Sequence, residues 1–215
     1  MRQGQLAHGK WPDQHPEYLC AGVLMIQAEI GGGARVDPGT GVQRPGFMIR
    51  DFTLQSNRGE RIAISDFRGR SSLLIVFPGR SAAMRRLLED AALHGDQFIL
   101  RDAMVVAVIP GGPDKETLLI PGDTSILVLH DSTHAAHKLS GAMDEDGGLV
   151  PLVYLTDRFG EVISSCAVRG NASPPSLPEI FNTLEFISHQ CPECEPPEWP
   201  NDTNIDSASN PGSHS

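Results

Sequence analysis

Short apolar segments separated by turn residues run through the middle of the chain, and two of them are continuously apolar. These are Ser72 to Phe77 (SLLIVF) and Ala103 to Ile109 (AMVVAVI). Apolar runs of this length, rich in β-branched residues and closed by Pro-Gly, predict strands that are buried on both faces of a sheet. Ile126 to Leu129 is a third apolar segment and predicts a third strand.

Helical spacing of apolar residues follows two capping residues. Ser81 comes after Pro78-Gly79 and can cap a helix, whose apolar positions are Met84, Leu87, Leu88 and Ala91. Ser176 and Glu179 form a capping box around Pro178 and predict a second helix, over 176–190. Its apolar positions are Ile180, Phe181, Leu184 and Ile187. Asp131 or Ser132 can cap a short helix that ends at Leu139.

Alternating apolar residues predict the remaining strands. Arg61 to Ile64 is short and closes at Asp66 to Gly69, whereas Leu152 to Thr156 and Glu161 to Ala167 flank the turn Asp157-Arg158-Phe159-Gly160. Buried strands that alternate with helices indicate a three-layer α/β domain, and the hairpin adds an antiparallel part to its central mixed sheet.

The periodic segments occupy only part of the chain. Residues 1–43 hold one short apolar stretch and a Gly/Pro-rich linker that runs on to Gly46. Residues 191–215 are mostly Pro, Glu, Asn, Asp and Ser, with little to bury. We therefore expect a single domain over 44–190, with flexible extensions at both ends.

Charge and composition exclude several classes of function. The 215 residues include 17 Lys and Arg against 27 Asp and Glu, a formal net charge of −10. Such a chain has no electrostatic basis for binding nucleic acid or an anionic membrane. No segment reaches the ~18–20 apolar residues that span a bilayer, and no secretory signal is evident. Four cysteines do not make a disulfide framework, so we expect a cytoplasmic protein.

Five motifs in the correct order resemble the peroxiredoxins, the family of alkyl hydroperoxide reductase and thiol-specific antioxidant proteins. They are Pro45-Gly46-Phe47, Asp51 to Leu54, Ile64 to Arg70, Leu73 to Pro78, and Leu129 to Asp131 before a short helix. The hairpin turn Asp157 to Gly160 also matches the family. The resemblance covers 44–190 and implies a thioredoxin-like fold with thiol-dependent reduction of peroxides or disulfides. It also implies that Pro151, just before the Leu152 strand, is a cis proline beside the active site.

The resemblance has one important departure at the helix that begins near Ser81. In the family, a peroxide-reducing cysteine lies in the first turn of this helix, three residues after a threonine. The corresponding positions are Arg85 and Ala82, and no cysteine occurs between Phe77 and Arg85. The usual peroxidase chemistry therefore has no thiol here. We interpret Ser81 as a helix cap rather than as a nucleophile.

Cys191 and Cys194 form the clearest motif, Cys-Pro-Glu-Cys, which resembles the ending of a bacterial subgroup of redoxin-domain proteins. The spacing suits a dithiol/disulfide couple that exchanges with a thiol reductant or a disulfide substrate. The preceding helix C-terminus and the acidic neighbours Glu193, Glu195 and Glu198 would raise the thiol pKa and slow such a pair.

Two other interpretations of the Cys191 and Cys194 pair stay open. The pair could be half of a zinc site, completed by a helical group of His130, His134 and His137, or by the same pair from a second chain in a homodimer. Alternatively, the two thiols have only a structural role or none.

The histidines and the remaining cysteines have simpler interpretations. Polar residues on a solvated short helix would account for His130, His134 and His137, and buried or unused thiols for Cys20 and Cys166.

Overall fold

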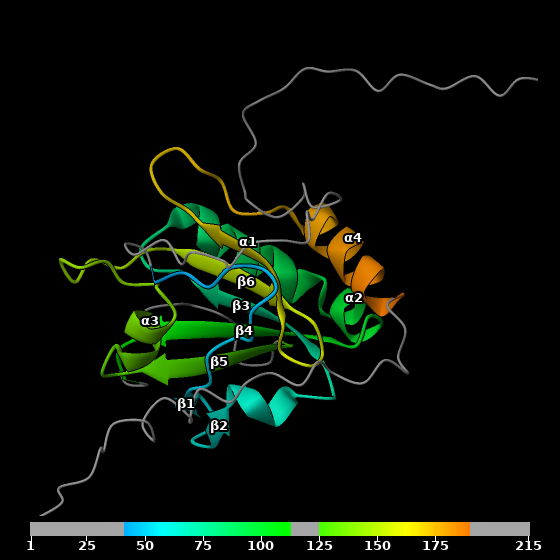
Figure 1. Ribbon diagram of the computed structural model, residues 1–215, viewed down its shortest axis with the longest axis horizontal. Coiled ribbons are helices and arrows are strands. Elements are labelled where there is room, and N and C mark those ends of the chain that lie inside the picture. The colour runs from blue at the N-terminus through cyan, green and yellow to red at the C-terminus, as the bar shows by residue number, and fades with distance from the viewer. Residues whose placement is uncertain (1–40, 113–124, 190–215) are drawn as a thin grey trace, which may run out of the picture.

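The two continuously apolar segments form neighbouring strands in the middle of a seven-stranded sheet, in a computed structural model that describes residues 41–112 and 125–189. The strand order is β2-β1-β5-β4-β3-β6-β7 (Figure 1). The strands are β1 (Thr53–Ser56), β2 (Arg61–Ala63), β3 (Ser72–Phe77), β4 (Ala103–Pro110), β5 (Ile126–Asp131), β6 (Leu152–Thr156) and β7 (Val162–Ala167). The helices are α1 (Ala82–Leu93), α2 (Gly95–Ile99), α3 (Ala135–Leu139) and α4 (Leu177–Ser188), with a 3-10 turn η1 (Ile64–Phe67).

The pairing of β3 explains its composition. All six of its residues are buried, because core clusters pack on both faces of the sheet. Both of its edges are paired, with β4 in parallel and with β6 antiparallel. β4 also pairs in parallel with β5, so the centre of the sheet is parallel and its outer part antiparallel. The predicted mixed sheet is confirmed.

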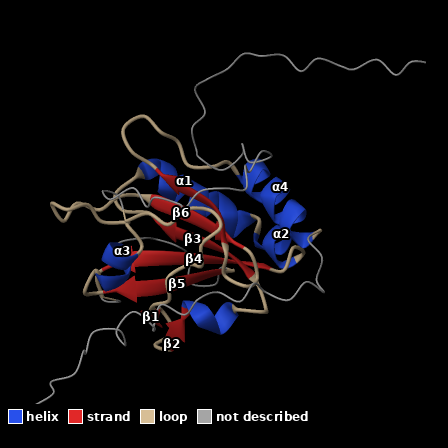
Figure 2. Ribbon diagram, in the orientation of Figure 1, coloured by secondary structure: helices blue, strands red, loops and turns tan. Residues whose placement is uncertain are grey.

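Alternation along β3 divides the core into two layers. Leu74 and Val76 pack against the helices α1, α2 and α4 on one face of the sheet. Leu73, Ile75 and Phe77 pack on the other face, where α3 and the segment before β1 lie. Each such side chain contributes about 1.5–3 kcal/mol when it is buried completely. Figure 2 shows these helices around the sheet.

The predicted helices form as their caps indicate. Ser81 precedes α1, whose buried residues are Met84, Leu87, Leu88 and Ala91. At α4, the Glu179 carboxylate accepts hydrogen bonds from the Ser176 backbone N–H at 2.7 Å and hydroxyl at 2.8 Å. Both helix predictions are confirmed, including Pro178 in the first turn of α4.

The structure differs from the sequence predictions at short elements. Ile64, expected in a strand, begins the η1 turn instead. α3 begins at Ala135, later than expected, because Asp131 completes β5. The Asp131 side chain nevertheless accepts the Ala135 and His137 N–H groups, so it does cap the helix as predicted. The structure adds β1 and α2 to the predicted elements. The boundaries at 43 and 190 remain predictions, since the flanking residues lie mostly outside the described ranges.

Within residues 41–112 and 125–189, no helix is long and apolar enough to cross a membrane.

Candidate functional site

The carboxyl ends of the three parallel strands meet at one edge of the sheet, near α3. Pro78 follows β3, Gly111 follows β4, and β5 ends at Asp131; the Gly111 N–H donates to the Asp131 carbonyl at 3.1 Å. Open α/β sheets bind ligands outside this edge, because the loops and helix starts gather there. The start of α1 and Pro151 lie at the same edge, so this is where the sequence places the candidate site.

Ser81 is occupied by capping the first turn of α1. Its hydroxyl oxygen accepts a hydrogen bond from the Met84 N–H at 3.4 Å, and its carbonyl accepts one from the Arg85 N–H at 3.2 Å. Ala82 and Arg85, which correspond to the family's threonine and cysteine, are exposed. This helix start therefore carries a cap and an arginine, and the interpretation of Ser81 as a cap is confirmed.

Pro151 lies beside the start of α1, where the sequence places it. A Cβ atom built on Gly79 would lie 3.4 Å from Pro151 Cγ, so the two backbones pass closely. Among the described residues no peptide bond is cis, so the expected cis proline is wrong. The segment is held on both sides of this bond: the Val150 N–H donates to the Ala142 carbonyl at 2.9 Å, and the Pro151 carbonyl accepts from the Val168 N–H at 2.8 Å.

A buried aspartate–histidine pair at this edge is the feature that the sequence interpretation missed. Asp131 Oδ2 lies 2.7 Å from Nδ1 of the His137 ring and accepts the His137 backbone N–H at 2.9 Å, while Oδ1 accepts the Ala135 N–H at 3.0 Å. Both residues are 0% exposed. The prediction of solvated helical histidines is therefore wrong for His137. Ala136 and His137 of α3 and its C-cap Ser140 are buried on one side. The spacing of the small residues Ala136 and Ser140, one helical turn apart, was the available signal that this side faces the core.

The electrostatics of the pair follow from these contacts. Burial raises the pKa of Asp131, but the hydrogen bonds from the His137 ring and backbone and the charge of that ring more than offset it, so the pKa lies below its ordinary value. The Phe77 ring packs edge-on against the His137 ring at a centroid distance of 5.2 Å. Nε2 of His137 and Oγ of Ser140 are buried and have no hydrogen-bond partner in the described part of the chain. Since the Asp131 carboxylate joins the end of β5 to the first residues of α3, we assign this pair a structural role.

The three histidines do not assemble into a group of metal ligands. Successive side chains of a strand alternate between faces, so His130 lies on the face of β5 opposite to Leu129 and Asp131. Burial lowers the pKa of His130. His134 and His137 have ring centroids 5.9 Å apart, but Nδ1 of His137 is engaged by Asp131. No group of three possible ligands occurs among the described residues. Because Cys191 and Cys194 lie outside these residues, the predicted contribution of the histidines to a zinc site with that pair stays a prediction.

Tyr154 joins α3 to the sheet and to the segment before β1. Its hydroxyl donates to the Ser140 carbonyl at 2.6 Å and accepts the Gln43 N–H at 2.9 Å. Burial raises the pKa of Tyr154 to about 12, so the phenol is neutral at physiological pH.

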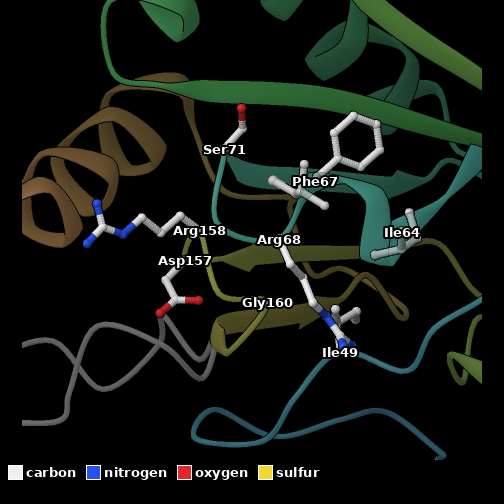
Figure 3. A pocket seen from close by; sticks show the side chains of 9 residues that line it. Ile49, Ile64, Phe67, Arg68, Ser71, Asp157, Arg158 and Gly160 are labelled. Carbon is white, nitrogen blue, oxygen red and sulfur yellow. The ribbon is translucent and has the colours of Figure 1, made fainter. Parts of the chain in front are cut away.

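A hollow near the Asp157–Gly160 turn lies at the other end of β3 and is not part of this site. It encloses about 180 Å³, including open solvent, and Phe67, Arg68 and Arg158 are among its lining residues. Figure 3 shows the side chains of Arg68 and Arg158 extending away from each other. Asp157 Oδ1 accepts the N–H groups of Phe159 at 2.9 Å and Glu161 at 2.8 Å, which holds the turn. We assign the hollow a structural role.

The cysteines divide between the described and the undescribed parts of the chain. Cys166 lies on β7 and is 8% exposed, which confirms the expectation of a buried thiol. Cys20, Cys191 and Cys194 lie outside the described residues. The predicted redox or metal pair therefore lies outside the described residues. In the sequence it follows shortly after His189, the residue that ends α4.

Comparisons with known proteins identify the fold. No protein-family model matches the chain, and no curated protein matches its sequence. Solved structures do match. A reduced Plasmodium vivax 2-Cys peroxiredoxin has a TM-score of 0.58 at 17% identity, over 68% of this chain and 83% of that one. Mycobacterium tuberculosis AhpC has a TM-score of 0.52 at 14% identity, over 70% and 97%.

A third match is Enterococcus faecalis AhpC, with a TM-score of 0.54 at 17% identity, over 66% of this chain and 90% of that one. The chain therefore has the thioredoxin-like fold of the peroxiredoxins, as the sequence resemblance implied. At these identities the likeness concerns the fold, and the chemistry has to be argued from this chain's own residues.

Proposed function

We propose that this protein is a peroxiredoxin-fold thiol–disulfide oxidoreductase that acts through Cys191 and Cys194 rather than at the start of α1. The observation that carries the proposal is the α1 start itself, where Ser81 caps the helix and an exposed arginine, Arg85, takes the position of the family's cysteine. The sequence offers one pair of thiols at a spacing that closes a disulfide, and that pair is Cys191 and Cys194.

The reaction proposed is thiol–disulfide exchange with a disulfide-containing protein or small molecule. One thiolate of the pair attacks a sulfur of the substrate disulfide, and the substrate's other sulfur leaves as a thiolate that takes up a proton. The second thiol of the pair loses its proton and displaces the substrate from the mixed disulfide. The products are a Cys191–Cys194 disulfide and a substrate dithiol. A thiol reductant would return the pair to its starting state.

This chemistry is expected to be slow toward peroxide. A peroxide-reducing thiolate is normally stabilised by a helix N-terminus and nearby cations. Cys191 and Cys194 instead follow the C-terminal end of α4 and have acidic neighbours. We therefore propose disulfides as the substrates, in the cytoplasm, where the glutathione and thioredoxin systems keep thiols reduced.

The test is to oxidise the full chain with glutathione disulfide, alkylate the remaining thiols, and map the products by mass spectrometry. The proposal expects a Cys191–Cys194 disulfide with Cys20 and Cys166 alkylated. Cys191→Ser and Cys194→Ser should each abolish reduction of a disulfide substrate, and Cys166→Ala is the matched control that should retain it. Alkylation of both tail thiols after oxidation, in metal-free protein, would contradict the proposal.

Stopped-flow mixing with hydrogen peroxide tests the expected selectivity separately. Thiol oxidation as fast as in ordinary peroxiredoxins would contradict the proposed preference for disulfides.

Elemental analysis of the same preparation addresses the alternative of a zinc-linked homodimer. If the remaining ligands come from a second chain, a cysteine pair from each chain would hold about one zinc per dimer.

A further inference from the structure

Three arginines lie unpaired on the surface around the first half of α1. Arg80, Arg85 and Arg86 are exposed. None of their side chains forms an ion pair or a hydrogen bond with a residue of the described ranges. We call these three residues the α1 arginine face. Because none of the three side chains is paired within the described domain, this face is available to an acidic partner.

The arginine face is not explained by the stability of α1. A helix is stabilised by acidic residues in its first turn and basic residues in its last turn. α1 has neither. Its acidic residues Glu89 and Asp90 lie one turn after Arg85 and Arg86, a spacing at which opposite charges attract weakly, although no ion pair forms between these side chains. Charges placed against the helix dipole cost stability, so their presence favours a role in recognition.

The chain itself supplies an oppositely charged segment. Residues 190–215 contain no Lys or Arg, and five carboxylates. These are Glu193, Glu195, Glu198, Asp202 and Asp206. The segment is joined to His189, at the end of α4.

The distance between the two ends decides which carboxylates could reach the arginine face. α1 starts on the side of α3, whereas α4 ends on the side of α2 (Figure 1), so a residue that reaches the arginine face from His189 has to span about the length of α1. The 12 residues of α1 span about 18 Å. An extended chain covers ~3.3–3.6 Å per residue, so Glu193 falls short at roughly 14 Å from His189, whereas Glu198 can extend to roughly 30 Å.

We propose that the acidic segment 195–206 of the same chain binds along the α1 arginine face. Opposite charge supplies the attraction, and attachment through His189 keeps the segment at a high effective concentration near the face. The proposal is independent of the thiol chemistry assigned to Cys191 and Cys194. It assigns the start of α1 to an intramolecular contact with the tail.

Cross-linking of a charge-preserving variant tests the contact. Arg80→Lys places a primary amine on the arginine face, and carbodiimide treatment of the full chain should join it to Glu198 or Asp202, as mapped by peptide mass spectrometry. Raising the salt concentration to about 1 M, where the Debye length is about 3 Å, should remove the cross-link. Adding Arg85→Glu and Arg86→Glu should lower its yield about fivefold or more.

The matched control carries the same change of charge elsewhere. Arg58→Glu and Arg61→Glu alter exposed arginines on the β1–β2 side of the sheet, and should leave the cross-link yield of the Arg80→Lys variant unchanged. Mixing ¹⁴N- and ¹⁵N-labelled protein separates the two sources of the segment. Cross-links within one isotope support the proposal. The absence of cross-links to residues 190–215, equal loss in the control, or cross-links found between isotopes would each overturn it.

Discussion

Replacing Asp131 by Asn should destabilise the domain strongly although the two side chains have the same shape. The carboxylate accepts N–H groups on both oxygens: Oδ1 from Ala135, and Oδ2 from the His137 backbone and ring. An amide presents an NH₂ group at one of the two positions. Whichever way it turns, at least one backbone donor at the start of α3 faces another donor and loses its partner.

The size of the effect follows from burial. Leaving one buried donor unsatisfied costs about 1–3 kcal/mol, and hydrogen bonds to a charged acceptor contribute about 1.5–3 kcal/mol each. We expect Asp131→Asn to lower the free energy of unfolding by about 2–4 kcal/mol, a large part of the ~5–15 kcal/mol of an ordinary domain. The melting temperature should fall by about 5–15 °C.

Urea unfolding followed by circular dichroism measures this difference. Asp146→Asn is the matched control, because Asp146 is exposed and its side chain has no hydrogen bond in the described ranges. The urea midpoint of this control variant should stay close to that of the unmodified chain. A midpoint for Asp131→Asn within the scatter of this control would refute the reasoning, since it would mean that the buried carboxylate contributes nothing net.

The same pair predicts a pH dependence with a definite sign. The pKa of Asp131 in the folded state lies below its ordinary value of 3.8. Protonation therefore favours the unfolded chain, so the contribution of Asp131 is fully present above pH 3.8 and is lost as the pH falls through the lower, folded-state pKa. The difference in stability between the unmodified protein and Asp131→Asn should thus be constant near neutrality and shrink in acid.

Three further substitutions test other parts of the structure. Tyr154→Phe removes both hydrogen bonds of the phenol and should lower the free energy of unfolding in urea by about 2–3 kcal/mol. Because the pKa of Tyr154 is raised to about 12, the stabilisation by the phenol is present below pH ~10 and is lost as the pH rises toward 12. The variant should lack this alkaline loss of stability. Ser81→Ala removes a long capping bond and should cost about 0.5–1 kcal/mol without changing the rate of thiol oxidation. Leu88→Ala empties a core position that is 1% exposed and should cost about 2–5 kcal/mol.

The elements predicted correctly are those in which local pattern and tertiary packing agree. Ser72 to Phe77 has the pattern of a strand buried on both faces, and it pairs on both sides. The capping box at Ser176 begins α4 where the local chemistry requires it. α2 was not predicted, because its five residues carry little periodicity and its Phe98 packs on Phe181 of a distant helix at a centroid distance of 5.0 Å.

The buried pair of Asp131 and His137 could not be predicted in the same way. A histidine near the end of a short helix is normally solvated, and its burial depends on Phe77 from β3, which lies 60 positions earlier. The position of His130 is a simpler case. Once β5 was known to extend to Asp131, alternation along the strand alone would have separated His130 from its neighbours.

The geometry of α1 separates the fold's usual active site from the thiols of this chain. A peroxiredoxin fold places its reactive group where β3 turns into the next helix, and that turn is intact here, with Ser81 as the cap and Pro151 packed against Gly79. Cys191 is only two residues beyond His189, a reach of roughly 7 Å, whereas the two ends of α1 are about 18 Å apart. We therefore expect the start of α1 to be out of reach of a thiolate at Cys191 in the same chain. The rate of thiol chemistry at this pair should then respond to its sequence neighbours Glu193 and Glu195 rather than to Arg85.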